Sequence, residues 1–292
     1  MIKKLAIIGV GLIGGSLARA LRQHQFVEHV VGCGRGKENL EKAIELDVID
    51  SYTHDPAEAV RDADMVVVAT NLRTIPAIFE AIVDELPADA LITDVGSAKG
   101  EVIKAAEKTL GDALPRFIPG HPIAGTEHSG VEASFAELYV DHRVILTPIA
   151  ENAEQDVQRV EKMWQRTGAL VKRMPAALHD EVLAATSHLP HMVAFALVDC
   201  LAAMETSTEI FDFAAGGFRD FPRIASSNPP MWCDIALENK AALLTQLDAF
   251  ERTLGELKKW LEAGDEQSML ALFERAKAAR DSIELPTSKA KS

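Results

Sequence analysis

Short apolar runs alternate with amphipathic segments over residues 1–174. The apolar runs include KKLAII, HVVGC, DMVVVAT, ALITDVG, RFIPG, RVILTPI and ALVKRM. Between them, segments such as GGSLARALRQH, ENLEKAIEL and AEQDVQRVEKMWQRTG carry apolar residues at the spacing of one helix face. Strands that take turns with crossover helices predict an α/β domain built on a doubly wound, mostly parallel sheet.

Beyond Pro175 the strand-like runs disappear and long helical patterns follow. We therefore expect a first domain over residues 1–174, an all-helical domain over 175–284 and a solvated tail over 285–292. The run MVAFALVDCLAAM carries more apolar surface than a small bundle buries, which favours a homodimer formed through the helical domain. A self-contained bundle is the alternative.

Charge and cysteine content restrict the partners and the compartment. The 292 residues include 44 acidic and 30 basic ones, for a formal net charge of -14, which repels nucleic acid and anionic membranes. No apolar run approaches the roughly 20 residues that a membrane span needs, so we expect neither partner. Three scattered cysteines suit a reducing compartment, here the cytoplasm, and no Cys/His spacing indicates a metal.

A glycine-rich turn follows the first predicted strand and opens the first predicted helix. Gly9, Gly11 and Gly14 have the spacing that binds a dinucleotide: the first allows a tight turn, the second close approach of a pyrophosphate, and the third tight helix packing. Such a turn is typical of a Rossmann-type domain. The candidate cofactor-binding residues are Gly9, Gly11, Leu12, Ile13, Gly14, Arg35 and, after the strand DMVVVA, Thr70.

Arg35 bears on the choice of cofactor. No carboxylate stands in the stretch 32–37, where one would bind the ribose hydroxyls of NAD, whereas Arg35 and Lys37 can neutralise a 2′-phosphate. The sequence therefore favours NADP over NAD. If Arg35 instead stacks on the adenine, either cofactor can bind.

Two loops rich in small and polar residues follow predicted strands: DVGSAKG, residues 94–100, and GHPIAGTEHSG, residues 120–130. Ligands bind beyond the carboxyl ends of the strands in open α/β sheets. Reactive side chains are therefore expected in these loops.

With these loops, the chain resembles the prephenate/arogenate (cyclohexadienyl) dehydrogenase family over essentially its whole length. The segments that carry the resemblance are GVGLIGGSLARAL, DVGSAKG, GHPIAGTEHSG, SHLPHMVAFALVD, GGFRDFPRIASSNPPMW and DIALENK. The resemblance implies oxidation of a ring hydroxyl by hydride transfer to nicotinamide, with loss of the ring carboxylate as CO2.

By motif position, the resemblance implies that His121 is the catalytic base. A neutral imidazole accepts a hydroxyl proton well near neutral pH. Ser97 is expected to hydrogen-bond with this histidine or with the substrate hydroxyl. The family substrate is a dicarboxylate, and the resemblance places Arg223 in its pocket, where a guanidinium suits carboxylate recognition.

Further substrate-binding candidates surround these three. His188 and His191 flank Pro190, which is expected to interrupt the helix, and they are candidates for binding a carboxylate or a carbonyl oxygen; buried structural histidines are the alternative. Thr126 and Glu127 are expected to order their loop, and the resemblance suggests that Glu127 gates the pocket, with Arg219 as an ionic partner. Arg219 in plain solvent is equally compatible.

Two other functions remain open at this point. A β-hydroxyacid dehydrogenase also joins a dinucleotide domain to a helical one, but it typically uses a lysine on a helix as its catalytic group. A non-catalytic NADP-sensing protein would keep the glycine turn without needing His121, Ser97 and Arg223 together. The sequence does not decide between prephenate and arogenate.

Overall fold

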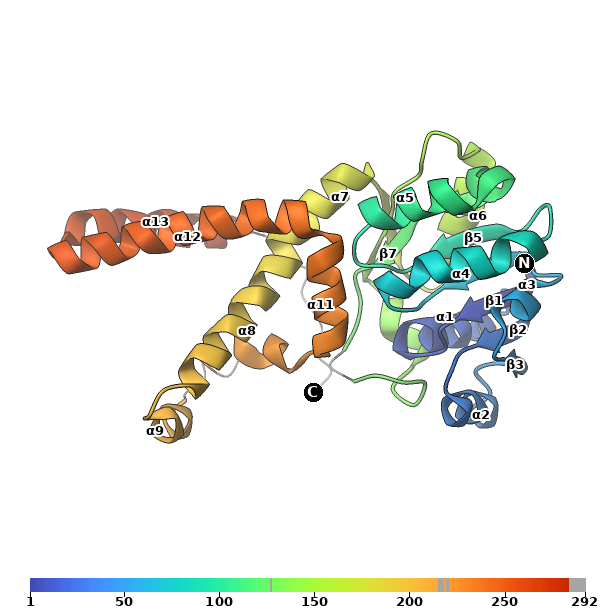
Figure 1. Ribbon diagram of the computed structural model, residues 1–292, viewed down its shortest axis with the longest axis horizontal. Helices are drawn as coiled ribbons and strands as arrows, with labels where there is room; N and C mark the ends of the chain where they lie inside the picture. Colours follow the sequence, from blue (N-terminus) through green and yellow to red (C-terminus); the bar gives the residue numbers. More distant parts are fainter. Residues whose placement is uncertain (127, 215–217, 219–220, 284–292) are drawn as a thin grey trace. The chain divides into compact units, whose positions relative to one another are not determined.

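The computed structural model describes residues 1–126, 128–214, 218 and 221–283. The chain divides into two compact units, Met1–Leu243 and Leu244–Ser292. The first unit contains the sheets and most of the helices (Figure 1).

Six parallel strands form the main sheet of the first unit. Their spatial order is β3-β2-β1-β4-β5-β6, with bounds β1 Ile2–Ile8, β2 Val27–Cys33, β3 Ser51–Thr53, β4 Met65–Val68, β5 Leu91–Asp94 and β6 Phe117–Ile118. The order reverses between β1 and β4, so the chain leaves these neighbouring strands in opposite directions and a crevice opens at their carboxyl ends. The doubly wound Rossmann-type prediction is confirmed.

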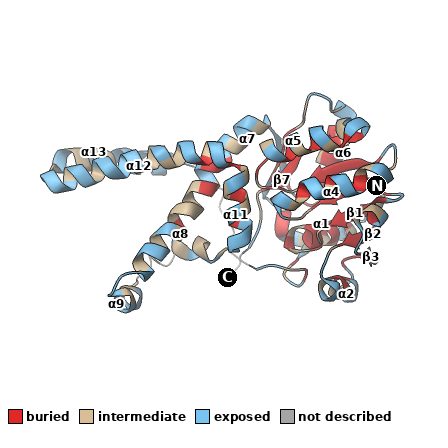
Figure 2. Ribbon diagram, in the orientation of Figure 1, coloured by how far each residue is buried: buried red, intermediate tan, exposed pale blue. Residues whose placement is uncertain are grey.

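Alternate residues of β1 enter two different apolar clusters. Leu5 and Ile7 pack into one cluster, whereas Ala6 and Ile8 pack into the other, as the twofold repeat of a strand requires when both faces are buried. Helices α1 (Leu12–Gln23), α2 (Lys37–Glu45) and α6 (Glu154–Gln165) contribute to the first cluster; α3 (Pro56–Val60), α4 (Ile75–Ile82) and α5 (Gly100–Thr109) contribute to the second. Figure 2 shows the buried residues gathered in this sheet and its covering helices.

A second, three-stranded sheet contains β7 (Gly120–Pro122), β8 (Arg143–Leu146) and β9 (Leu170–Arg173). The run RFIPG, expected to form one strand, is divided: β6 belongs to the main sheet and β7 pairs antiparallel with β8. Pro119 stands at the division, and it has no N–H to donate to a ladder. The Pro119 carbonyl accepts a hydrogen bond from the Thr147 N–H at 2.9 Å. Because the chain passes from the main sheet to the second sheet at this residue, His121 lies in the middle of β7.

From residue 175 onward, all regular structure in the described residues is helical, as expected. The first unit contains α7 (Ala176–Leu183), a π-helical turn (Ala184–His188), α8 (Leu189–Ala202), α9 (Ser207–Asp212), a 3₁₀ turn (Pro222–Ser226) and α11 (Pro229–Glu238). The π turn ends at His188, two residues before Pro190, which lacks the N–H needed to continue the α-helical ladder. The α-helical pattern therefore changes ahead of Pro190, but the helical stretch Ala176–Ala202 continues through this residue, so it is not interrupted there.

One helical stretch among the described residues, Ala176–Ala202, is long and apolar enough to cross a membrane by length and composition. The expectation that no stretch would meet these criteria is therefore wrong, because it considered only uninterrupted apolar runs. A single such helix is weak evidence for a span. This one carries His179, Asp180 and His188, whose polar contacts lie within the protein.

The second unit consists of α13 (Glu266–Ser282) and most of α12 (Lys240–Ala263). None of its described residues is buried, and Leu254, Leu261, Leu270 and Phe273 are all at least 48% exposed. The residues of this unit are correspondingly tan and blue in Figure 2. By itself this unit has no core.

Candidate active site

The glycine turn between β1 and α1 leaves room for a ligand at one glycine and none at the other two. Gly9 has φ +104°, and a Cβ there would collide with the Ala69 carbonyl; a Cβ at Gly14 would collide with the Gly9 carbonyl. A Cβ at Gly11, by contrast, would meet nothing within 4 Å. The free N–H groups of the first turn of α1 therefore face open space, which suits a pyrophosphate.

Thr70 follows β4, across from this turn. Its backbone nitrogen lies 3.1 Å from the Cβ position of Gly9, and its hydroxyl is buried with no hydrogen-bond partner among the described residues. A buried hydroxyl without a partner is free to bond a ligand or an ordered water. The residues at the crevice between β1 and β4 thus fit a dinucleotide.

The carboxyl end of β2 carries charges of both signs. Arg35 is exposed just beyond it and forms no ion pair within the described part of the chain. Burial, followed by the charges of Asp55 and Glu58, raises the pKa of the Cys33 thiol at the end of β2 to about 11. Two carboxylates therefore stand near this strand end, although the local sequence contains none.

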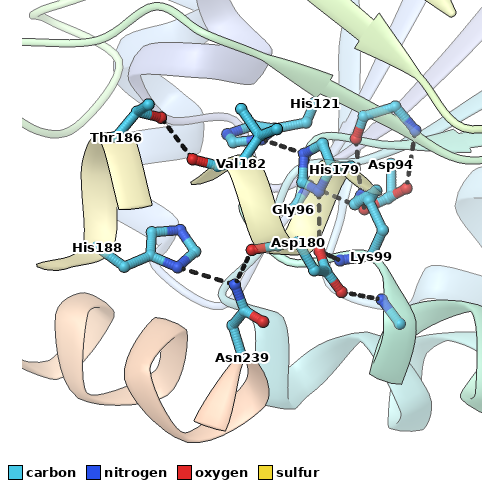
Figure 3. A network of polar contacts seen from close by, with 12 residues as sticks. Asp94, Gly96, Lys99, His121, His179, Asp180, Val182, Thr186, His188 and Asn239 are labelled. Carbon is cyan, nitrogen blue, oxygen red and sulfur yellow. Dashed lines mark hydrogen bonds and ion pairs between the residues drawn. The ribbon is translucent and has the colours of Figure 1, made fainter. Parts of the chain in front are cut away.

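His121, in β7, begins a relay of polar contacts that leads to α7 (Figure 3). Its Nδ1 lies 2.9 Å from Nε2 of His179, and Nδ1 of His179 lies 2.8 Å from Oδ1 of Asp180. The Asp180 carboxylate also accepts the backbone N–H groups of Lys99 and Gly100, each at 2.8 Å. Asp180 thus ties α7 to the start of α5.

These contacts determine where the protons lie on the two imidazoles. Burial raises the pKa of Asp180, but hydrogen bonds from His179 and from the two N–H groups outweigh it and hold the pKa below the ordinary value. An ionised Asp180 only accepts, so the neutral form of His179 carries its proton on Nδ1 and presents a lone pair at Nε2. His121 then donates from Nδ1, and its own Nε2 keeps a lone pair.

His121 is 8% exposed, and burial is the largest reason why its pKa lies well below the ordinary value of a histidine. The Lys99 ammonium acts in the same direction, as His179 and His188 do in their protonated forms. At neutral pH His121 is therefore an uncharged imidazole with a free lone pair, the form that accepts a proton.

A buried ion pair joins the loops that follow β5 and β6. The Lys99 ammonium and the Asp94 carboxylate are both fully buried and in contact, and Lys99 also donates to the Gly120 carbonyl at 2.8 Å. Asp94 accepts the N–H groups of Gly96 and Gly120. The residue before His121 is therefore held directly by the Asp94–Gly100 loop.

Ser97 lies half-buried in this loop, and its hydroxyl forms no hydrogen bond with His121 or with another described residue. Nδ1 of His121 is paired with His179, and its Nε2 remains open. Of the two contacts expected for Ser97, the one to the substrate hydroxyl stays a prediction.

His188 and His191 have different surroundings, although both lie beside Trp232. His188 is 1% exposed, and its Nδ1 lies 3.1 Å from the amide nitrogen of Asn239. The His191 ring stacks on Trp232 with centroids 3.5 Å apart, and its Nδ1 lies 2.8 Å from the Ser187 carbonyl oxygen. Trp232 itself is buried in the second apolar cluster. Burial lowers the pKa of both histidines, to about 4 for His188.

Arg223 lies exposed in the 3₁₀ turn Pro222–Ser226 and lines an open hollow of about 470 Å³ together with apolar side chains that include Val198 and Phe211. His121 does not line this hollow. Arg223 is nevertheless close enough to His191 for its charge to lower the pKa of that imidazole. The two ends of the predicted substrate site are thus linked through His188 and His191.

The remaining candidates lie at the edge of the described structure. Thr126 is exposed, and its hydroxyl accepts the N–H of His128 at 3.2 Å. Glu127 and Arg219 lie outside the described residues. Among the residues that are described, no group of three or more His, Cys, Asp or Glu side chains has the arrangement of a metal site.

Sequence reasoning missed four residues of this network: His179, Asp180, Lys99 and Asn239. Two of them lie in motifs quoted above, Lys99 in DVGSAKG and Asn239 in DIALENK, whereas the His179–Asp180 pair lies early in the helical region that follows Pro175. The signal available was a polar side chain within an otherwise small or apolar motif. Their partners are far away in the chain, so no local spacing revealed the contacts.

Comparison with known proteins gives matches over nearly the whole chain. A family model described as the nucleotide-binding domain of prephenate dehydrogenase matches residues 17–173, and one described as the dimerization domain of prephenate dehydrogenase matches residues 175–275. A cyclohexadienyl dehydrogenase from Zymomonas mobilis is 40% identical over 282 residues, which are 95% of each chain.

Solved structures agree with these matches. The prephenate dehydrogenase of A. aeolicus, in complex with hydroxyphenyl propionate and NAD+, superimposes with a TM-score of 0.89 at 39% identity, covering 96% of this chain and 98% of that one. An arogenate dehydrogenase from Synechocystis gives a TM-score of 0.80 at 28% identity, covering 95% and 99%.

Proposed function

Since the chain belongs to the prephenate dehydrogenase family, we propose that it oxidises and decarboxylates prephenate, arogenate or both, with hydride transfer to NAD(P), on the route to tyrosine. The observation that carries the proposal is the relay from Asp180 through His179 to His121. It leaves His121 neutral, with a lone pair at Nε2, beside the loops that end the strands of a dinucleotide-binding sheet.

In this mechanism His121 moves the proton of the ring hydroxyl. When bound, the nicotinamide supplies the acceptor for the hydride of the hydroxyl-bearing carbon. His121 Nε2 takes the hydroxyl proton as this C–H bond breaks, so that a carbonyl forms at the ring. The ring carboxylate then leaves as CO2, its bonding electrons complete the aromatic ring, and the oxygen takes a proton back to give a phenol.

His179 and Asp180 are positioning residues in this scheme. When His121 gains a proton at Nε2 it becomes cationic, and the Asp180 carboxylate acts through His179 to stabilise that charge. Ser97, on the loop held by Lys99 and Asp94, is the proposed hydrogen-bond partner of the substrate hydroxyl.

The substrate dianion requires positive charge and donors in a protein with net charge -14. Arg223 is the proposed carboxylate ligand because its guanidinium is exposed in a hollow and belongs to no ion pair among the described residues. His188 and His191 are proposed to contact the same ligand, with Thr126, Glu127 and Arg219 ordering the loops around it.

For the cofactor we propose a preference for NADP, with Arg35 on the 2′-phosphate. Its exposure at the end of β2 supports this assignment, and the nearby Asp55 and Glu58 oppose it. Arg35→Ala should raise the KM for NADP about tenfold or more and leave the KM for NAD nearly unchanged. Only NADP carries the 2′-phosphate, so only NADP loses a charge-assisted hydrogen bond in this variant. Steady-state kinetics with both cofactors measure this, and an unchanged NADP/NAD ratio would count against the assignment.

We further propose a cytoplasmic homodimer that pairs through the helical residues 175–284. The match of residues 175–275 to a dimerization domain supports pairing. The exposed leucines of α12 and α13 and the sparse burial of α8 support it as well. Cys33, Cys200 and Cys233 are free thiols, as a reducing compartment maintains.

The proposed activity is tested by crossing prephenate and arogenate with NAD and NADP in steady-state assays that follow reduced cofactor and released CO2. With at least one of the two ring substrates, we expect the enzyme to form reduced cofactor and CO2 in equal amounts. Cofactor reduction without CO2, or turnover confined to simple β-hydroxyacids, would contradict the proposal.

A further inference from the structure

The side chain of Asn239, which follows α11 in the segment DIALENK, contacts two groups through one nitrogen. Its Nδ2 lies 2.8 Å from the Asp180 backbone carbonyl oxygen and 3.1 Å from Nδ1 of His188 (Figure 3). A carbonyl oxygen can only accept, so the atom that faces Asp180 must be the amide nitrogen; the reversed amide would place its oxygen against the Asp180 carbonyl oxygen. Chemistry therefore determines the orientation of this 5% exposed side chain.

The Asn239 amide in turn determines the tautomer of His188. An amide nitrogen donates and does not accept, so Nδ1 of His188 must be the acceptor and the proton of the neutral ring lies on Nε2. Burial is the largest cause that lowers the pKa of His188 to about 4; neighbouring His179 and His191 lower it further, and Asp180 and the Ser97 backbone oppose them. The ring is therefore neutral near pH 7.

The Nε2–H group of His188 is a buried donor without a partner. Within the described part of the chain no well-formed hydrogen bond reaches Nε2, although a weaker contact with the Ser97 backbone raises the His188 pKa. The same imidazole is close enough to His121 to affect its pKa. The Nε2–H group of His188 thus lies beside the catalytic loops, where an oxygen atom of a ligand can accept its hydrogen bond.

We propose that Asn239 is a positioning residue that holds His188 as an Nε2–H donor for a lone pair of a substrate oxygen. This role rests on the proposed function of the site, because it requires that the substrate reach the Ser97 loop. The tautomer itself does not depend on the substrate, so it can be tested separately.

The first test measures the tautomer in the full-length protein without substrate. Nitrogen-15 chemical shifts of His188 should show a protonated Nε2 and an unprotonated Nδ1. Asn239→Asp keeps the shape and replaces the donor by an acceptor, so Nδ1 should become protonated in this variant. A wild-type spectrum with the proton on Nδ1 would overturn the proposal, whatever the enzyme oxidises.

The second test uses two amides that imitate different nitrogens of the ring. Glutamine at residue 188 places its amide nitrogen near the position of Nε2, and asparagine places it near Nδ1. His188→Gln should keep the KM for the ring substrate within a few-fold, whereas His188→Asn should raise it roughly tenfold to a hundredfold, the loss expected for a hydrogen bond to a charged group. The KM for the cofactor should stay constant in both.

Thermal unfolding of the two variants controls for damage to the fold. Equal substrate KM values for two variants of equal stability would overturn the role of the Nε2 donor. A rise confined to the cofactor KM would overturn the assignment of the acceptor to the substrate. If the wild-type protein oxidises neither prephenate nor arogenate, the proposed function fails, and the nitrogen-15 experiment still decides whether Asn239 sets the tautomer.

Discussion

At the scale of single residues, the environment of His121 makes it a base that is uncharged before the substrate arrives. Burial and the neighbouring Lys99 and His179 disfavour a proton on its ring. A general base works best when its pKa is near the working pH. The approach of a dianionic substrate would favour the charged form, and it therefore moves the pKa of His121 back towards that range.

Replacing His121 should affect the chemical step far more than binding. His121→Asn retains an amide near the position of Nδ1, so the contact with His179 can persist while the base at Nε2 is lost. We expect kcat to fall by roughly a hundredfold to ten-thousandfold, the usual contribution of general base catalysis. The cofactor dissociation constant, measured by fluorescence titration, should change little. Small and equal effects on all parameters would exclude His121 as the base.

Replacing Arg223 should affect binding more than the chemical step. Arg223→Ala removes a charge-assisted hydrogen bond that forms in the ground state as well as in the transition state, so the KM for the ring substrate should rise roughly tenfold to a hundredfold with kcat little changed. Arg159 is an exposed arginine of α6, and Arg159→Ala is the matched control, which should leave the KM for the ring substrate unchanged. If Arg223→Ala lowers kcat and leaves KM unchanged, another group binds the carboxylate.

At the scale of elements, α7 connects the helical region to the sheet domain through Asp180. This carboxylate accepts N–H groups at the start of α5, where the helix dipole favours negative charge, and it pairs with His179 from the same helix. The Asp180 side chain thus connects α7 with α5 and determines which nitrogen of His179 carries the proton. Its loss should affect stability and catalysis together.

Asp180→Asn tests this double role with nearly unchanged shape. An amide can present a donor to His179, which would reverse the tautomers along the relay and place a proton on His121 Nε2. We expect kcat to fall roughly a hundredfold or more, as tautomer reversal does in hydrolytic triads, together with a lower Tm by calorimetry. Glu181→Gln, the exposed neighbour on α7, should change neither. Wild-type kcat in Asp180→Asn would remove the relay from the mechanism.

At the scale of the whole molecule, several helices expose more apolar surface than they bury. Leu254, Leu261, Leu270 and Phe273 of the second unit are exposed, and Ala194 is the buried residue of α8 among those described. A second copy of the chain is the occupant that the dimerization-domain match favours. Burial of such surface is worth roughly 25 cal/mol per Å², so charge within it should weaken the dimer strongly.

Leu261→Glu combined with Phe273→Glu should therefore shift the protein from dimer to monomer in sedimentation velocity at micromolar concentration. The desolvation of two carboxylates would oppose pairing. Lys258→Glu on the same helix is a control that changes charge at a residue which is already polar. A wild-type protein that sediments as a monomer would contradict the proposed homodimer.

The sequence by itself determined the order of strands and helices, the dinucleotide turn and the loops that carry Ser97 and His121. Each of these depends on periodicity and glycine spacing within a few residues, and the carboxyl ends of parallel strands always meet at one edge of a sheet. A break in the α-helical pattern near Pro190 was predictable for the same reason, since a missing N–H acts locally, and it takes the form of the π turn Ala184–His188.

Only the tertiary structure decided which side chains complete the site. His121 and His179 are 58 residues apart, and His188 and Asn239 are 51 apart, so their contacts arise from how α7, α8 and α11 pack and from no local pattern. The same holds for the carboxylates of Asp55 and Glu58, which a later strand brings back to the end of β2. The positions of protons on buried imidazoles depend on such contacts, because a ring nitrogen donates where its partner is an acceptor and accepts where its partner is a donor.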